Sequence, residues 1–334
     1  MQVAYITQTG GPEVIQIGEQ PVPEPAATQV LVKVHAVAVN PIDTYIRSGA
    51  VALPIEFPYT IGCDLAGVVE TCGANGKRFK PGDRVWGSNQ GLFGRKGSFS
   101  QFAAVDEDWL YPIPEKQSFD EAAAAALVGI TAHLGLFLHA NMQPGEVVFV
   151  NGGTGGVGSA VVQLAKAKGA KVIATVGSDE KKKLCASWGA DCVLDYHSPT
   201  LDDDIKTFAD ANGGLNIWWE TQREPTFDRT VSLLSRRGRI VLMAGRTARP
   251  EFPVGPFYVK DLKLVGFAMF NASPAEQRVC AADLNELASQ GKWNLPIGAT
   301  FPLSQAADAH RLQEENTLNK AGTLRGKIVL HPWS

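Results

Sequence analysis

The sequence predicts an α/β protein in which a doubly wound parallel sheet is inserted into a β-rich domain. Apolar runs of strand length alternate with helical patterns between Val147 and Phe267, which is typical of a buried parallel sheet. Short strands fill the chain before residue 120, and one last strand, Gly326–Leu330, is expected to return to that first domain. A chain of 334 residues favours two domains, and we place their segments at residues 1–122, 123–271 and 272–334.

The first segment is expected to form a compact, barrel-like β unit. Turn signals rich in Gly and Pro separate short β-branched or alternating runs, as in small barrels. The loop Gly87–Ser98 contains four glycines and is predicted to be a mobile flap. The expected strands are Val3–Ile6, Val14–Ile17, Val30–Val39 and Leu65–Glu70.

An alanine-rich helix over Phe119–Phe137, interrupted at Gly129, is expected to cross between the domains. The chain is 45% hydrophobic with a net charge of -3, which argues against binding to nucleic acid or a membrane surface. We expect no apolar run near the roughly 20 residues of a membrane span, and no signal peptide. Five scattered cysteines suit reduced thiols in a cytoplasm.

A glycine-rich loop marks the start of the second domain. The apolar strand Val147–Val150 runs into five glycines among seven residues, and a helical pattern follows to Gly169. Gly153, Gly155 and Gly158 satisfy G-x-G-x-x-G. One glycine allows the turn, the next lets backbone amides approach a pyrophosphate, and the last lets helix pack on strand. Because a second strand, Lys171–Val176, follows the helix, the context favours dinucleotide binding over an empty turn.

Four further strands complete the predicted sheet, at Cys192–Tyr196, Leu215–Glu220, Arg239–Ala244 and Leu262–Phe267. Helices are expected at Phe227–Leu234 and near Ala275–Gln290, and Trp218 and Trp219 are expected to lie in the core.

Four motifs in this order resemble those of the medium-chain dehydrogenase/reductase superfamily: Asn40–Gly49, Gly62–Val69, Pro81–Val85 and Asn151–Gly158. Together they are most similar to its zinc-independent quinone oxidoreductase branch. The resemblance implies a Rossmann domain inserted into a GroES-like barrel domain, NADPH as cofactor, and a homodimer. Sheet-edge contact near Phe267–Phe270 is the surface we expect to pair the subunits.

The zinc enzymes of that superfamily place a Cys and a His in the first two motifs. Here Asp43 lies in the first, and Cys63 stands where the His would be. A catalytic zinc needs three convergent ligands, which Cys63 and Asp64 alone do not supply. The cysteines of the structural zinc lobe are also missing, because no Cys occurs between Gly73 and Leu184. We therefore expect no metal, and Cys63 as a small buried thiol.

By resemblance, Asn40 and Tyr45 are the catalytic candidates, as polar groups beside the nicotinamide. Tyr45 can also donate the proton that follows hydride transfer. The alternative is that Tyr45 is an ordinary packing tyrosine. Asp43 and Asp64 are expected to serve structure, as turn-forming or paired carboxylates.

The choice of nicotinamide cofactor depends on the end of the second strand, at Gly177–Ser178. Ser178 is expected to cap a helix, and Lys181 and Tyr196 match the family's contacts to a 2′-phosphate, which favours NADPH. Asp179 keeps NADH open, and the lysines that begin at Lys181 are alternatively a solvated helix face. The other expected cofactor contacts are Thr131, Gly153, Thr154, Gly155, Gly156, Val157, Gly158, Ala244, Gly245, Phe267 and Ala268.

The sequence predicts hydride transfer from NADPH to a quinone. A reductase of α,β-unsaturated carbonyls or enoyl thioesters fits the same motifs. A third hypothesis, of another class, is a non-catalytic NADPH-binding structural or sensor protein. The predicted partner is a small-molecule quinone or enone, with no nucleic acid and no membrane.

Overall fold

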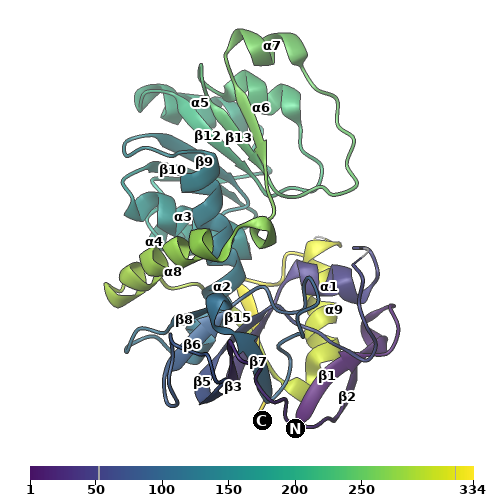
Figure 1. Ribbon diagram of the computed structural model, residues 1–334. Helices are drawn as coiled ribbons and strands as arrows, with labels where there is room; N and C mark the ends of the chain where they lie inside the picture. The colour runs from purple at the N-terminus through teal and green to yellow at the C-terminus, as the bar shows by residue number, and fades with distance from the viewer. Residues whose placement is uncertain (52, 320) are drawn as a thin grey trace. The chain divides into compact units, whose positions relative to one another are not determined.

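The computed structural model describes residues 1–51, 53–319 and 321–334. The chain forms two compact units (Figure 1), one of Met1–Leu127 with Ser273–Ser334 and one of Val128–Ala272. The structure thus divides the chain after residues 127 and 272, against the expected 122 and 271.

The first unit is built on mostly antiparallel strands around the eleven-residue strand β3 (Gln29–Val39). One sheet has the order β15-β16-β3-β5-β6-β8, with β7 also paired to β3, and a smaller sheet has the order β2-β1-β4. All four expected strands are found within two residues of their predicted ends. The strands are β1 (Gln2–Ile6), β2 (Gln16–Glu19), β4 (Tyr59–Thr60), β5 (Asp64–Cys72), β6 (Arg84–Gly87), β7 (Phe102–Asp106) and β8 (Leu110–Pro112).

The expected strand at Val14–Ile17 is shifted. Pro12–Val14 forms a 3-10 turn, so that β2 begins only at Gln16. Proline favours such a turn because its ring fixes φ and it brings no N–H that needs a partner at a first helical position.

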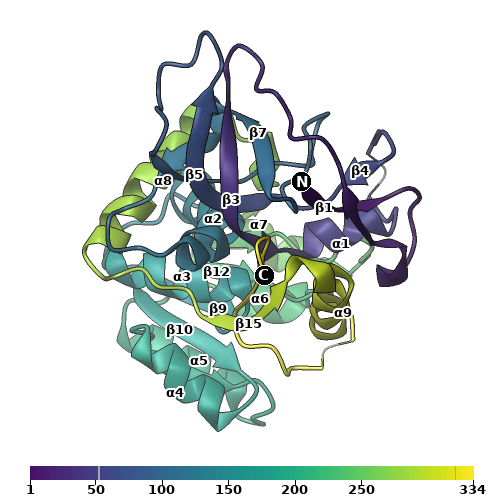
Figure 2. The same ribbon diagram turned by 90° about the horizontal axis from the view of Figure 1, so that it is seen from below.

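The C-terminal segment returns to this unit as expected. β16 (Lys327–His331) pairs antiparallel with β3, and β15 (Ile297–Pro302) pairs parallel with β16. Helix α1 (Pro41–Arg47) packs against α9 (Ala306–Thr317), as Figures 1 and 2 show.

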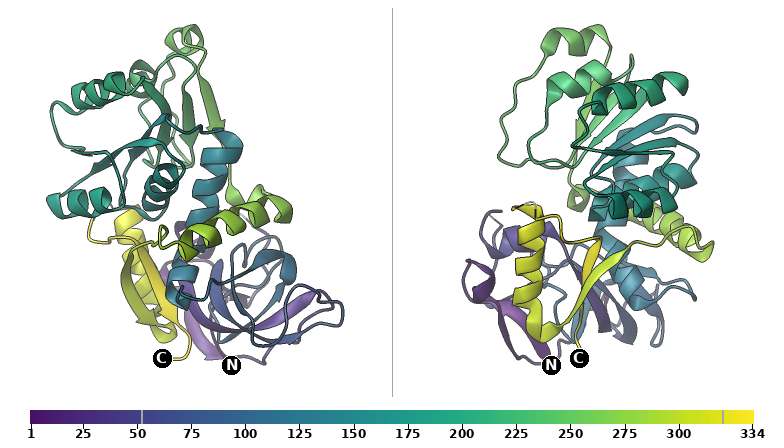
Figure 3. Two further views of the ribbon diagram at one scale, coloured as in Figure 1. Left: turned by 90° about the vertical axis from the view of Figure 1, so that its left-hand side faces the viewer. Right: turned by 180° about the vertical axis from the view of Figure 1, so that it is seen from behind.

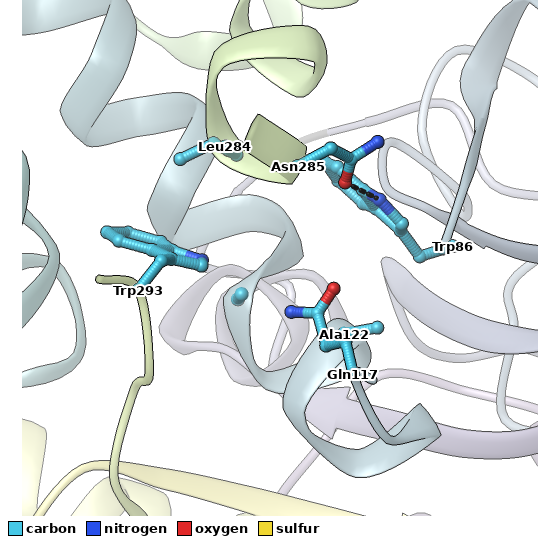
Figure 4. Close-up of a pocket in the computed structure, with 7 residues that line it drawn as sticks. Trp86, Gln117, Ala122, Leu284, Asn285 and Trp293 are labelled. Atoms are coloured by element: carbon cyan, nitrogen blue, oxygen red, sulfur yellow. Dashed lines mark hydrogen bonds between the residues drawn. The ribbon is translucent and has the colours of Figure 1, made fainter. Parts of the chain in front are cut away.

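Helix α8 (Pro274–Ser289) is fixed to the barrel by Asn285. Trp86 Nε1 donates to Asn285 Oδ1 (3.0 Å), and Asn285 Nδ2 donates to the carbonyl oxygen of Pro112 (2.8 Å). The small cavity beside this contact (Figure 4) has a volume of about 10 Å³, which is room for about one water molecule. It is too small for an organic substrate.

The loop Gly87–Ser98, which is predicted to be a mobile flap, is mostly buried and hydrogen-bonded to its own unit. The side chains of Ser88, Asn89 and Leu92 are at most 1% exposed. The loop backbone is bonded to the segment before β5, through Gln90 N to the Cys63 carbonyl (3.1 Å) and Ser98 N to the Gly62 carbonyl (3.1 Å). Only residues 93–96 at its tip reach the surface.

Helix α2 (Phe119–His133) runs without a break through Gly129 and continues as wider π-helical turns over Leu134–His139. The expected interruption at Gly129 is therefore wrong. The expectation that no apolar run approaches a membrane-spanning length is also wrong. By length and composition alone, the helix Phe119–His139 is long and apolar enough to cross a membrane. Since 78% of the window is buried inside the protein, it has the character of a core helix, which passes the same test.

The second unit is a six-stranded parallel sheet with the order β11-β10-β9-β12-β13-β14. This is the doubly wound Rossmann order, which confirms the predicted fold class. The strands are β9 (Val147–Asn151), β10 (Lys171–Val176), β11 (Cys192–Asp195), β12 (Leu215–Glu220), β13 (Arg239–Leu242) and β14 (Lys263–Gly266).

Helices cover both faces of this sheet (Figure 3). Trp218 joins the buried cluster that α5 and α6 form with the sheet, and its ring lies 4.1 Å from that of Phe149. The next residue, Trp219, points to the other face, and both indoles are buried, as expected. The helices are α3 (Gly156–Ala167), α4 (Asp179–Ser187), α5 (Leu201–Ala211), α6 (Phe227–Leu233) and α7 (Val254–Val259).

Candidate functional site

The glycine-rich loop lies between β9 and α3, at the carboxyl end of the central strand. β9 ends at Asn151, and α3 begins at Gly156 with Gly155 as its N-cap. Gly152 has φ of +89°, so the sharp turn is made at this residue and not at the first glycine of the motif.

The three motif glycines meet different surroundings. A Cβ on Gly153 would lie 2.7 Å from Ala174 Cβ, and one on Gly158 would collide with the backbone of Gly152. These two glycines therefore permit close packing. A Cβ on Gly155 would meet only the Gly152 carbonyl oxygen, at 3.7 Å. The space over Gly155 is open, and the backbone amides at the start of α3 can approach an anion there.

A second group of predicted residues meets where β10 and β11 end. Ser178 caps α4 as expected, accepting from the Lys181 backbone N–H (3.3 Å). Tyr196 folds back so that its hydroxyl lies against Gly177. The structure thus brings Ser178, Lys181 and Tyr196 to one corner of the sheet. It adds His197, whose ring lies 4.2 Å from that of Tyr196 and which the sequence analysis did not single out.

The remaining predicted contacts follow other strands or lie on α2. Ala244 and Gly245 follow β13, which ends at Leu242, two residues earlier than expected, and Gly245 has φ of +80°. Phe267 and Ala268 follow β14. Because the sheet is parallel, these segments and the glycine-rich loop share one edge. Thr131 is buried in α2.

Phe267 points into its own unit. Its ring stacks on His139 at 4.5 Å and meets Trp219 edge-on at 6.4 Å, while Met269 is buried. Phe267 is partly buried by these contacts, and subunit pairing by sheet-edge contact near Phe267–Phe270 stays a prediction.

In the first unit, Asn40 uses its amide for bonds within the protein. Nδ2 donates to Asp64 Oδ2 (2.8 Å) and to the Ala38 carbonyl oxygen (3.3 Å), and Oδ1 accepts from Lys327 Nζ. Both amide hydrogens are taken and the residue is fully buried. Asn40 is thus held by its neighbours at the start of α1, and its place beside the nicotinamide stays a prediction.

Asp43 is the structural carboxylate that was expected, because it accepts from the Asn40 backbone N–H (2.8 Å) at the first turn of α1. Burial raises the pKa of Asp43 to about 7, and the nearby Asp64 carboxylate adds to this. Burial also raises the pKa of Cys63 well above its ordinary value. Cys63 is thus the small buried thiol that was predicted.

Lys327 is the residue of this cluster that sequence reasoning missed. Its ammonium is 4% exposed and donates to the Val39 carbonyl oxygen (2.8 Å) as well as to Asn40. Burial lowers the pKa of Lys327, and the carboxylates of Asp64 and Asp43 oppose that shift. A lysine at the start of a β-strand gives no signal in the sequence that it will be buried beside two acids.

The donor set of this cluster does not fit a catalytic zinc. Asp64 already accepts from Ser88 Oγ (2.6 Å), Asn40 Nδ2 and the Leu127 backbone N–H (3.3 Å). The ammonium of Lys327 supplies the local positive charge that a cation would otherwise bring. Among the described residues, no three His, Cys, Asp or Glu side chains are grouped to hold a metal ion. A zinc site needs three such ligands.

Tyr45 lies on α1, five residues after Asn40, and is partly buried. This position agrees with a proton donor beside the nicotinamide and equally with an ordinary packing tyrosine.

Two family models match the chain, an alcohol dehydrogenase GroES-like domain over residues 26–115 and a zinc-binding dehydrogenase over residues 156–287. The human quinone oxidoreductase is 34% identical over 331 residues, covering 99% of this chain and 97% of the relative. Quinone oxidoreductase 1 of Escherichia coli is 30% identical over 326 residues, covering 94% and 96%.

Solved structures agree in fold over the whole chain. The E. coli quinone oxidoreductase complexed with NADPH has a TM-score of 0.86 at 27% identity, covering 99% of this chain and 100% of that one. An NAD-dependent alcohol dehydrogenase has a TM-score of 0.87 at 28% identity, covering 99% of each chain. With its two domains, its glycine-rich loop and these relatives, the chain belongs to the quinone oxidoreductase branch of the medium-chain dehydrogenase/reductase superfamily.

Proposed function

We propose that this protein is an NADPH-dependent oxidoreductase that works without zinc and transfers a hydride to a quinone. The observation that carries the proposal is the glycine-rich loop, in which Gly153 and Gly158 are packed tightly while the space over Gly155 is open. That shape suits a pyrophosphate held by backbone amides at a helix N-terminus. NADPH is the cofactor of the similar E. coli quinone oxidoreductase structure.

The corner at the end of β10 supports NADPH over NADH. A 2′-phosphate placed there would meet the Lys181 ammonium, the Ser178 hydroxyl and the Tyr196 hydroxyl. A lysine is a point charge suited to phosphate. Of the predicted cofactor contacts, we propose that these three select NADPH over NADH.

When bound, NADPH supplies the hydride. The chain's own residues bind and orient it, and α1 presents Tyr45 as the proposed proton donor to the reduced acceptor oxygen. A quinone is electrophilic enough to accept hydride without a Lewis acid, which agrees with a first-unit cluster built around Lys327 and not around metal ligands.

The test is a cofactor and acceptor screen with the purified protein. We expect loss of NADPH absorbance at a rate that depends on an added naphthoquinone, with slower oxidation of NADH. Faster turnover of an enone or an enoyl thioester would move the assignment to that reductase class. Tight NADPH binding with no oxidation by any acceptor would favour the structural or sensor hypothesis.

The zinc content of the purified protein tests whether the enzyme works without zinc. Elemental analysis of the purified enzyme is expected to find less than about 0.1 zinc per chain, because a catalytic zinc requires three protein ligands. Quinone reduction is expected to persist after dialysis against a chelator. Stoichiometric zinc that is lost together with activity would contradict it.

We also propose a homodimer in the cytoplasm. All five cysteines are free thiols, which agrees with a reducing compartment. The surface for subunit pairing is the outer edge of β14 with helix α7, where Val254, Tyr258 and Val259 are exposed.

A further inference from the structure

We propose that Glu220 is a positioning residue that holds the phosphate-binding loop in its binding-competent shape. Glu220 ends β12 and does not belong to the glycine motif. A line of hydrogen bonds leads from its carboxylate to the backbone N–H of Gly152, at the turn of that loop. The inference rests on the proposed dinucleotide site and assigns it a residue beyond the predicted contacts.

The Glu220 carboxylate is buried and surrounded by donors. Oε1 accepts from Asn151 Nδ2 (3.0 Å) and from the Gln222 backbone N–H (2.7 Å), and Oε2 accepts from Trp218 Nε1 (3.0 Å). The side chain is 2% exposed. Burial raises the pKa of Glu220, and these three donors oppose that shift. A carboxylate that accepts several hydrogen bonds in a dry environment fixes the orientation of every donor around it.

Asn151 connects the Glu220 carboxylate to the loop through Thr175. Because Nδ2 faces Glu220, Oδ1 must face Thr175, and it accepts from Thr175 Oγ1 (3.0 Å). The Thr175 hydroxyl has then given its hydrogen to Asn151, so its lone pair is left for the Gly152 N–H (3.0 Å). The carboxylate thereby fixes the direction of every bond in the line.

The same carboxylate also joins the turn after β12 to the loop. Gln222 N is bonded to Glu220, and Thr221 Oγ1 donates to the carbonyl oxygen of Asn151. Gly152 is held between this turn and Thr175 of β10. The loop is therefore braced from both neighbouring strands before a dinucleotide arrives, which lowers the ordering cost of binding.

Replacing Glu220 by Gln keeps size and shape but reverses the hydrogen-bonding pattern. In either orientation the new NH₂ group faces a donor: at the Oε2 position it meets Trp218 Nε1, and at the Oε1 position it meets Asn151 Nδ2 and the Gln222 N–H. The hold of residue 220 on Asn151 is therefore weakened. For E220Q we expect the Kd for NADPH to rise about tenfold, which equals about 1.4 kcal/mol. We expect kcat at saturating NADPH to stay within about twofold, because no reacting atom is touched.

The matched control is E146Q, the same change at a partly buried carboxylate of this unit. Glu146 precedes β9, at its other end, and pairs with Arg239 (2.8 Å). We expect E146Q to lower the melting temperature but to leave the Kd for NADPH unchanged. If E146Q weakens NADPH binding as much as E220Q does, or if E220Q leaves the Kd unchanged, the positioning role is overturned.

A second pair keeps the test decisive if E220Q does not fold. T175V removes the hydroxyl between Asn151 and Gly152, and T175S keeps it. We expect T175V to weaken NADPH binding about tenfold and T175S to bind like the wild type. Equal Kd values for the two variants would overturn the proposal. A wild-type protein that binds no nicotinamide cofactor would instead refute the proposed function.

Discussion

At the scale of single residues, two carboxyl groups and one ammonium share the interior of the first unit. Asp64 accepts three hydrogen bonds, from Asn40, Ser88 and Leu127. The carboxyl of Asp43 accepts from the Asn40 backbone N–H and lies against the Cys63 thiol. Burial raises the pKa of both carboxyl groups, and at Asp64 the charge of Lys327 and the hydrogen bonds from Ser88 and Asn40 oppose that shift. The pKa of Asp43 is raised to about 7, so this acid holds its proton at mildly acidic pH.

This proton makes stability depend on pH. The unfolded chain releases it near the ordinary pKa of 3.8, and the folded protein holds it up to about 7. Between these values the folded state binds more protons, so the free energy of unfolding falls as pH rises, by at most about 1.4 kcal/mol per pH unit.

D43N removes that titration and can keep the bond to the Asn40 N–H through its amide oxygen. We expect its stability relative to the wild type to increase between pH 5 and pH 8 by about 1–3 kcal/mol. Urea denaturation at several pH values measures this. A difference between D43N and wild type that does not change with pH would contradict the shifted pKa.

The Lys181 ammonium is the group that we expect to distinguish NADPH from NADH. K181A removes the cation at the Ser178–Tyr196 corner, and we expect the KM for NADPH to rise about tenfold, a typical cost for one charge-assisted phosphate contact. The KM for NADH should change less than about twofold, since NADH lacks the 2′-phosphate. K182A, one residue along on the exposed side of α4, is the control and should alter neither value. If K181A raises the KM for NADPH and the KM for NADH by the same factor, the phosphate contact is refuted.

At the scale of elements, the glycine-rich loop separates packing from ligand access. In G158A the new Cβ collides with the Gly152 backbone, so both the melting temperature and NADPH binding should fall. In G155A the nearest atom is 3.7 Å away, and the melting temperature should stay within about 2 °C of the wild type.

The Cβ of G155A nevertheless enters the space that we assign to the pyrophosphate. We therefore expect NADPH binding to weaken at least tenfold in this stable variant, as measured by fluorescence titration. If G155A binds NADPH normally, the pyrophosphate lies elsewhere.

Elements could be predicted where one local rule dominates. The parallel strands from β9 to β14 are mostly apolar runs, and Ser178 caps α4 by a short-range bond. The burial of Lys327 and the bonds of Asn40 could not be predicted, because they depend on residues 287 positions apart in the sequence. The glycines of the loop Gly87–Ser98 predict mobility, whereas its tertiary hydrogen bonds to Gly62 and Cys63 cannot be predicted from the sequence.

At the scale of the whole molecule, the second unit has an edge that is open in the single chain. β14 is the last strand in the order of its sheet, so its outer edge has no strand partner among the described residues. In α7, the helix that precedes β14 in the chain, Val254, Tyr258 and Val259 are 64%, 66% and 68% exposed. An open edge and exposed apolar side chains would favour aggregation if they were left uncovered.

A second copy of the chain is the partner that fits this surface. Two copies related by a two-fold axis place β14 antiparallel to its own counterpart, which closes both edges at once and extends the sheet across the pair. The wild type should therefore sediment as a dimer. V259E puts a carboxylate in the apolar contact and should shift the species to a monomer, because an unpaired charge is costly to bury.

V279E is the matched control for that experiment. Val279 lies on α8 in the first unit and is 61% exposed, so the same substitution meets similar solvent away from β14. This variant should remain a dimer and keep its NADPH binding. A monomeric wild type, or a V259E variant that sediments like V279E, would exclude the β14–α7 surface as the subunit contact.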